Sequence, residues 1–397
     1  MVVDASDRPP DEPEILVTAT PVGLEVDGHT VDTDISGLTS AFAPLRLTAE
    51  RAPSTDAGKL QRQGYSTGLA RALAENTARY DFRFWVLDNS GSMRIGDGHR
   101  LVQLDGGKRR SVKCTRWEEL QETVQYHAHM AATMESPVIF QLLNDPGMRL
   151  VPARFGVCEH GPSHAREEVN EAVSIMRRVS PSGVTPITQH IMLVRESIAR
   201  IAPELRRRGK AVAVILATDG LPTDAQGCGG ERVTSEFVRA LRSLGGLPVW
   251  TVVRLCTDDP EVREFYNSLD EQLELSVEVL DDYHGEAREV YRYNPWICYA
   301  EPLHRCRELG YHDRLFDMID ERPLTMGEAR KFCSFLLGVN EYDLPDPAVD
   351  AKAFIKTLNI RLEQETMQFN PIKKKLTPWI LTKELKKTFS NRNCAIM

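Results

Sequence analysis

Residues 82–92 read FRFWVLDNSGS, and this stretch decides the fold. Its first six residues are rich in aromatic and apolar side chains, which is typical of a buried strand, and a polar turn follows. In open α/β sheets, ligands bind at the edge where the strands end. Asp88, Ser90 and Ser92 present oxygen-bearing side chains at alternate positions there. Because a carboxylate and two hydroxyls suit a hard cation such as Mg2+, the stretch predicts a strand that ends in a cation-binding loop.

Two later segments complete this pattern. Residues 182–186, SGVTP, form a turn-rich stretch ahead of a long helical pattern, and residues 211–218, AVAVILAT, form a second buried-strand run. The five side chains at these boundaries are Asp88, Ser90, Ser92, Thr185 and Asp219. In order and spacing they resemble the metal-ion-dependent adhesion site of von Willebrand factor type A domains. A lone Asp-x-Ser-x-Ser string would be weak evidence, but three separate parts at strand or turn boundaries are specific.

The resemblance implies a role for each residue of the site. Ser90 and Ser92 would bind the metal directly, Asp88 and Asp219 would supply charge directly or through water, and Thr185 would join when the site is engaged. Mg2+ is the expected ion, with Mn2+ and Ca2+ as alternatives. Because Mg2+ takes six ligands and this set is small, a position stays open for an acidic residue of a partner protein.

Strands alternate with helices from residue 80 to residue 282, which indicates an α/β fold. We expect a doubly wound, mainly parallel sheet flanked by helices, of the type A or Rossmann-like kind, with a hairpin inserted at residues 100–113 beside the metal loop. We expect an acidic, disordered tail at residues 1–14 and a β-rich extension and connector with an Asp-Gly hairpin signal at 15–60. A linking helix follows at 61–79. After the sheet domain come a helical extension at 283–372 and a basic tail at 373–397. The helical extension could form a cap on the sheet or a small domain of its own.

Composition bounds the setting of the protein. The chain has 397 residues and a net charge of −8, which argues against nucleic acid as a partner. Its eight cysteines are scattered, the N-terminus lacks a signal-peptide pattern, and no apolar stretch reaches the roughly 20 residues that span a bilayer. We therefore expect a cytoplasmic protein with reduced thiols.

The C-terminal sequence adds a membrane signal. Residues 393–397 read NCAIM, which fits a prenylation signal at Cys394, and the final Met favours farnesyl. Seven Lys and Arg residues precede it between residues 373 and 392, against Glu384 alone. Basic residues strengthen the weak anchoring by one lipid chain, so we expect attachment to the cytoplasmic face of an anionic membrane. The alternative is a chance cysteine beside a solvated helix face.

These features predict a Mg2+-dependent protein-binding module on a membrane, a setting that resembles that of copines, although nothing here suggests their C2 domains. Two alternatives remain: a metal-assisted hydrolase or ligase with its catalytic part in residues 283–372, and a metal-independent scaffold. The chain has no glycine-rich phosphate loop and no Gly-x-Ser-x-Gly nucleophile elbow, and its Cys and His spacing does not provide a RING module. We therefore expect a binding protein rather than an enzyme.

Overall fold

The computed structural model describes residues 25–26, 29–30, 45, 47, 56–103, 109–148, 151–272 and 277–394. The chain divides into two compact units, residues 1–43 and 44–397. In the first unit, strand β1 (Glu25–Val26) pairs antiparallel with β2 (His29–Thr30). This pairing is the hairpin expected around the Asp-Gly signal. Residues 1–14, for which we expected disorder, lie outside the described part of the chain.

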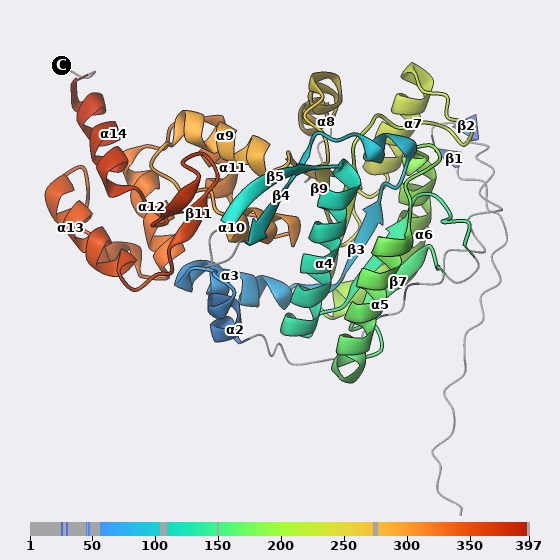
Figure 1. The fold of residues 1–397 in the computed structure, drawn as a ribbon, viewed down its shortest axis with the longest axis horizontal. Coiled ribbons are helices and arrows are strands. Elements are labelled where there is room, and N and C mark those ends of the chain that lie inside the picture. Colours follow the sequence, from blue (N-terminus) through green and yellow to red (C-terminus); the bar gives the residue numbers. More distant parts are fainter. Residues whose placement is uncertain are drawn as a thin grey trace, which may run out of the picture. The chain divides into compact units, whose positions relative to one another are not determined.

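The second unit, whose fold Figure 1 shows, is built on a six-stranded sheet. The strand order is β10-β9-β8-β3-β6-β7, and every pairing is parallel except that of β6 with β7. Its strands are β3 (Tyr80–Leu87), β6 (Val138–Leu142), β7 (Arg154–Val157), β8 (Ala211–Thr218), β9 (Val249–Leu255) and β10 (Val277–Leu280). Strand β3 lies in the middle of the sheet, and all eight of its residues are buried. The predicted α/β fold with a mainly parallel sheet is confirmed.

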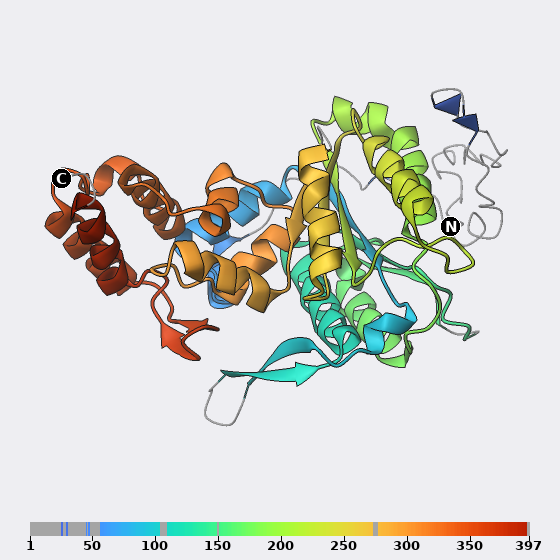
Figure 2. The same ribbon diagram turned by 90° about the horizontal axis from the view of Figure 1, so that it is seen from above.

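Helices cover both faces of this sheet (Figure 2). Helices α4 (Arg116–Met134) and α5 (Ala165–Arg178) pack on one face, and α6 (Ile187–Arg207) and α7 (Glu231–Arg242) on the other, while α8 (Pro260–Gln272) packs beside β10. Side chains alternate along β3, so Trp85 and Leu87 share a core cluster with α4, while Phe84 and Val86 point to the opposite face. The 3-10 turn η3 (Pro162–His164) leads directly into α5, and a second, η4 (Glu341–Asp343), lies in the loop before α13 (Ala351–Leu362).

The expected insertion forms a hairpin of β4 (Gly98–Gln103) and β5 (Arg109–Cys114), between the 3-10 turn η1 (Gly91–Arg94) and α4. Figure 2 shows this hairpin projecting from the sheet. Its start is tightly held, since a Cβ on Gly98 would lie only 2.8 Å from the Thr115 carbonyl oxygen. The first residue of the hairpin therefore lies directly against Thr115, the N-cap of α4.

The helical C-terminal region packs against the sheet as a cap. It contains α9 (Tyr283–Tyr293), α10 (Glu301–Glu308), α11 (Arg314–Glu321), α12 (Met326–Leu337) and α13 (Ala351–Leu362). Within residues 61–79, where a linking helix was expected, the structure has α3 (Thr67–Thr77). A further helix, α2 (Ala57–Arg62), begins in the segment expected to be a connector, and Gly64, at φ +96°, separates the two helices. One buried core joins these helices to α4, through side chains that include Leu69, Met130, Trp296 and Phe332.

The C-terminal basic segment is more ordered than a tail. Strand β11 (Gln368–Asn370) pairs antiparallel with β12 (Lys375–Thr377), and α14 (Thr382–Cys394) follows. Leu385 and Phe389, one helical turn apart, are buried in the core of the cap. Because apolar residues at this spacing give a helix one buried face, the segment folds back onto the protein despite its charge.

Candidate metal-binding site

Asp88 is held by both of its carboxylate oxygens. Its Oδ1 accepts the backbone N–H of Ser90 at 2.9 Å, and its Oδ2 accepts the hydroxyl of Thr218 at 2.7 Å. Thr218 is the last residue of β8, the parallel neighbour of β3. Parallel strands end at a common edge, and this pairing fixes the Asp88 carboxylate at that edge.

Ser90, Ser92 and Asp219 form a continuous chain of hydrogen bonds beside Asp88. The hydroxyl oxygens of Ser90 and Ser92 are 3.0 Å apart, and the Ser92 hydroxyl donates to Asp219 Oδ1 at 2.8 Å. Asp219 lies 127 residues after Ser92 in sequence, directly after β8. The structure thus brings four of the five predicted site residues into direct or near contact.

Thr185 is brought to the same loop cluster by backbone contacts. The Ser182 N–H donates to the Asn89 carbonyl at 2.7 Å, and the Gly91 N–H donates to the Gly183 carbonyl at 3.2 Å. Thr185 itself is buried, and its backbone exchanges hydrogen bonds with Thr223. Within the described residues its hydroxyl makes no hydrogen bond to the other four side chains. Thr185 therefore lies in the wall of the site, outside the hydrogen-bonded chain.

Arg116 is a residue of this site that the sequence did not indicate. Its Nη1 donates to Asp219 Oδ2 at 2.8 Å, while Nε and Nη2 hold Asp97 at 2.8 and 2.6 Å. The Asp219 side chain is fully buried, and that of Arg116 is 8% exposed. Arg116 therefore neutralises part of the charge at Asp219 and occupies one of its oxygens, which leaves Oδ1 turned toward Ser92.

The donor set fits a hard divalent cation. Burial, and after it the neighbouring Asp219 carboxylate, raise the pKa of Asp88 to about 6. Two close, buried carboxylates are stabilised by a cation between them. Within the described residues no three carboxylate, imidazole or thiol side chains gather as a metal cluster. A cation here would thus be held by two carboxylates together with hydroxyls, a set that suits Mg2+ better than zinc.

Two asparagines shape the site, and sequence reasoning missed both. Asn89 Oδ1 accepts the N–H of Asn144 at 2.8 Å, and Asn144 Nδ2 donates to the Val184 carbonyl at 2.8 Å. A Cβ on Gly183, at φ +93°, would lie 2.6 Å from Asn144 Oδ1. These contacts fix the turn that carries Thr185. The position of Asn144 after β6 was the signal that could have identified it, because this strand ends at the same edge.

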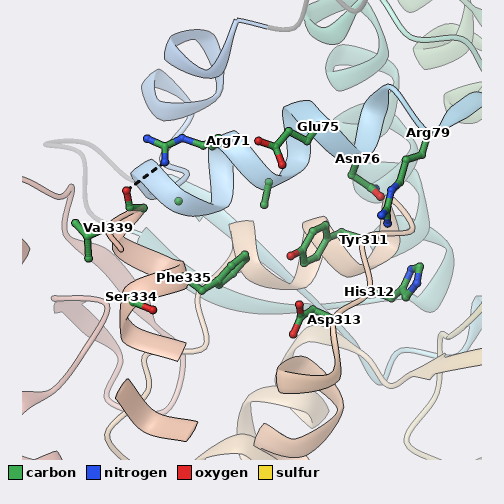
Figure 3. Close-up of a pocket in the computed structure, with 13 residues that line it drawn as sticks. Arg71, Glu75, Asn76, Arg79, Tyr311, His312, Asp313, Ser334, Phe335 and Val339 are labelled. Carbon is green, nitrogen blue, oxygen red and sulfur yellow. Dashed lines mark hydrogen bonds between the residues drawn. The ribbon is translucent and has the colours of Figure 1, made fainter. Parts of the chain in front are cut away.

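A cavity of about 420 Å³ lies elsewhere, between α3, α12 and the residues before α11 (Figure 3). Two arginines and two carboxylates line it, so its formal charges balance; these are Arg71, Arg79, Glu75 and Asp313. The hydroxyl of Ser334 donates to a backbone carbonyl of its own helix, and the His312 ring stacks on Trp250 at 3.6 Å. These side chains do not form a paired nucleophile and base.

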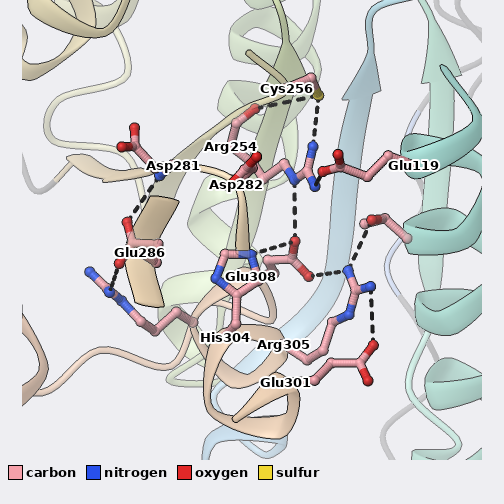
Figure 4. Close-up of polar contacts among 12 residues, drawn as sticks. Glu119, Arg254, Cys256, Asp281, Asp282, Glu286, Glu301, His304, Arg305 and Glu308 are labelled. Atoms are coloured by element: carbon pink, nitrogen blue, oxygen red, sulfur yellow. Dashed lines mark hydrogen bonds and ion pairs between the residues drawn. The ribbon is translucent and has the colours of Figure 1, made fainter. Parts of the chain in front are cut away.

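A buried ionic network connects the sheet to the cap (Figure 4). Arg254 of β9 pairs with Glu119 of α4 and with Glu308 of α10. Burial acts to raise the pKa of Glu308, but the guanidinium of Arg305, 2.9 Å away, and two neighbouring imidazoles hold that pKa well below its usual range. Because all of these groups are buried, we assign the network a structural role.

Comparisons with known proteins add no family assignment. No protein-family model matches this chain, and a search of curated proteins found no significant match. Within the described residues, no helix combines the length and apolar character needed to cross a bilayer.

Proposed function

We propose that this site binds Mg2+ and, through it, an acidic residue of a partner protein, as the resemblance to type A domains implies. The observation that carries the proposal is the chain of hydrogen bonds from Ser90 through Ser92 to Asp219, beside the buried Asp88. These side chains come from two strand ends and meet at the sheet edge where ligands bind in this fold class.

Each residue then has a defined part in binding. Ser90 and Ser92 would supply hydroxyl oxygens, and Asp88 and Asp219 the negative charge, with Thr185 joining from the adjacent turn. Arg116 already balances part of the Asp219 charge. A dication would therefore keep positive charge that these residues do not neutralise, and a partner carboxylate would complete its coordination. Mn2+ or Ca2+ could take the same place.

We also propose that the protein is held on the cytoplasmic face of an anionic membrane, with a farnesyl group on Cys394. Supporting this are the basic residues of α14 and of the turn before it. Residues 395–397 of the prenylation signal lie outside the described part of the chain. Replacing Cys394 by Ser should move the protein from the membrane fraction to the soluble fraction of a eukaryotic cell.

The metal site is tested by titrating Mg2+ into the purified chain and by recovering partners in Mg2+ or in EDTA. Ser90→Ala/Ser92→Ala should weaken Mg2+ binding at least tenfold and release the partner. Asp219→Asn should do the same while it keeps an acceptor for Arg116. The control is Ser163→Ala, at an exposed serine outside the site. If the partner is retained equally with EDTA and in the double variant, the protein is a metal-independent scaffold.

A further inference from the structure

The last forty-four described residues carry a charge opposite to that of the whole chain. Between residues 351 and 394 there are ten Lys and Arg residues and three Glu, in a protein whose net charge is −8. Charge separation of this kind directs one part of a molecule toward an anionic surface.

Part of this charge lies along one side of α14. Lys383, Lys386 and Lys387 are exposed, and their spacing places them on one face of the helix. Leu385 and Phe389 are buried on the opposite side. The buried pair fixes the rotation of the helix, so the three lysines have a defined direction.

The turn between β11 and β12 adds to the same face. Lys374, Lys375 and Leu376 are exposed there, and Leu376 is 55% exposed. The Nζ of Lys373 lies 3.9 Å from Glu384 Oε1 of α14, which places the turn beside the helix. We define the basic face as Lys373–Leu376 together with Lys383, Lys386 and Lys387.

The turn is held in shape. Asn370 Oδ1 accepts the N–H groups of Ile372 and Lys373 at 3.1 and 2.9 Å. Lys374 adopts a left-handed backbone conformation, with φ 51°. Leu376 is therefore presented to solvent by a defined turn.

We propose that the basic face docks on an anionic lipid bilayer and that Leu376 inserts at the level of the headgroups. Lysines near an anionic leaflet each strengthen binding, and an exposed apolar side chain gains by leaving water for the acyl boundary. Ile360 on α13 and Met367 just before β11 are also exposed, at 53% and 47%. This inference rests on the membrane location proposed above, but it does not require the lipid on Cys394.

The exposed apolar residues favour a bilayer over nucleic acid as the occupant. Single-stranded nucleic acid binds to basic grooves that carry aromatic side chains, on which the bases stack. Among the described side chains of residues 351–390, the large exposed apolar ones are aliphatic or a thioether: Ile360, Met367 and Leu376. A nucleic acid would leave Leu376 in water, whereas a bilayer would bury it.

The test uses the full chain without a lipid, sedimented with vesicles in about 0.1 M salt, where surface charge is only partly screened. Wild type should bind vesicles of phosphatidylserine and phosphatidylcholine and should not bind phosphatidylcholine alone. Lys374→Glu/Lys375→Glu should lower the partition coefficient at least roughly thirtyfold. Separately, Leu376→Ser should lower it roughly tenfold, through the loss of apolar burial. The control is Arg166→Glu/Arg177→Glu, which makes the same charge change at exposed positions of α5 and should bind as wild type does.

In vitro, three results would overturn the inference: no binding to the anionic vesicles, equal binding by the lysine double variant, or tighter binding to a single-stranded RNA oligomer. If membrane association in cells depends only on Cys394, the lipid anchor is supported and the proposal for the basic face is wrong. Vesicle binding should be unchanged in EDTA, so this result and the result for the metal site can be read separately.

Discussion

At the scale of single residues, His190 gives the clearest dependence on pH. Its Nε2 lies 3.0 Å from the Leu143 carbonyl oxygen, and burial lowers the pKa of His190 to about 4. The folded protein therefore keeps this imidazole neutral, whereas the unfolded chain takes up a proton below about pH 6.5. The stabilising contribution is complete above pH 6.5, falls as the pH drops from 6.5 toward 4, and changes no further below 4.

We therefore predict that His190→Gln reduces the loss of stability on acidification. Between pH 6.5 and 5.5, the difference in unfolding free energy between variant and wild type should shift by about 1 kcal/mol in favour of the variant. Urea unfolding at both pH values measures this shift. His129→Gln, at an exposed histidine on α4, is the control. A shift of the same size in the control would show that the effect comes from the change in overall charge and not from the burial of His190.

Site residues could be predicted from the sequence where they directly follow a recognisable strand, because the strand places them at the carboxyl edge of the sheet. Asp88 and Asp219 each follow a long apolar run, so their positions at the ends of β3 and β8 could be predicted. Arg116 was not readable, because its partners lie 19 and 103 residues away and only the folded sheet brings them together. The Thr185 turn was predicted, but its fixing by Asn144 depends on a contact 40 residues away.

At the scale of elements, the crossing of α3 and α12 depends on a missing side chain. A Cβ on Gly68 would lie 1.7 Å from the Phe335 carbonyl oxygen and 2.6 Å from the Gly338 nitrogen. Both are backbone atoms, so only a separation of the helices could make room. The Ser66 hydroxyl also bonds the Leu336 carbonyl at 2.6 Å across this crossing. The backbones of the two helices are thus in direct contact at this crossing.

Gly68→Ala should therefore destabilise the protein by about 3 kcal/mol, as overpacking does in a rigid core. The control is Gly327→Ala within α12, where the added Cβ meets no atom within 4 Å. This control should gain about 0.5–1 kcal/mol, because alanine favours the helix. Chemical denaturation of both variants checks the pair. Equal stabilities would show that the helices separate without cost.

Elements with a periodic hydrophobic pattern could be predicted from the sequence. Elements whose position depends on packing against residues far away in the sequence could not. The alternation of strands and helices from residue 80 to residue 282 gave the sheet, because each apolar run must be buried. The C-terminal segment was expected to be a basic tail, since its charge hides the pair Leu385 and Phe389. Their burial depends on a core formed with α12 and α13, which local sequence does not show.

At the scale of the whole molecule, the sheet relies on the cap to satisfy its buried charges. Arg83 of β3 donates to the Leu309 carbonyl at 2.9 Å, and Arg254 of β9 pairs with Glu308. His127 of α4 also lies 2.8 Å from Glu308. A buried charge that loses its partner costs several kcal/mol, and the total stability of a domain is only about 5–15 kcal/mol.

We therefore predict that a fragment of residues 56–282 does not fold cooperatively, although it contains the whole sheet and the candidate metal site. It should lack a near-ultraviolet circular dichroism signal and a sharp thermal transition. Residues 1–43 form a separate unit, so the chain that starts at residue 44 should keep the melting temperature of the full protein. A cooperative transition in the sheet fragment would show that the ionic network joins two independently stable parts. If the fragment shows no cooperative transition, the metal site needs the cap in order to fold, and so does the binding of any partner at that site.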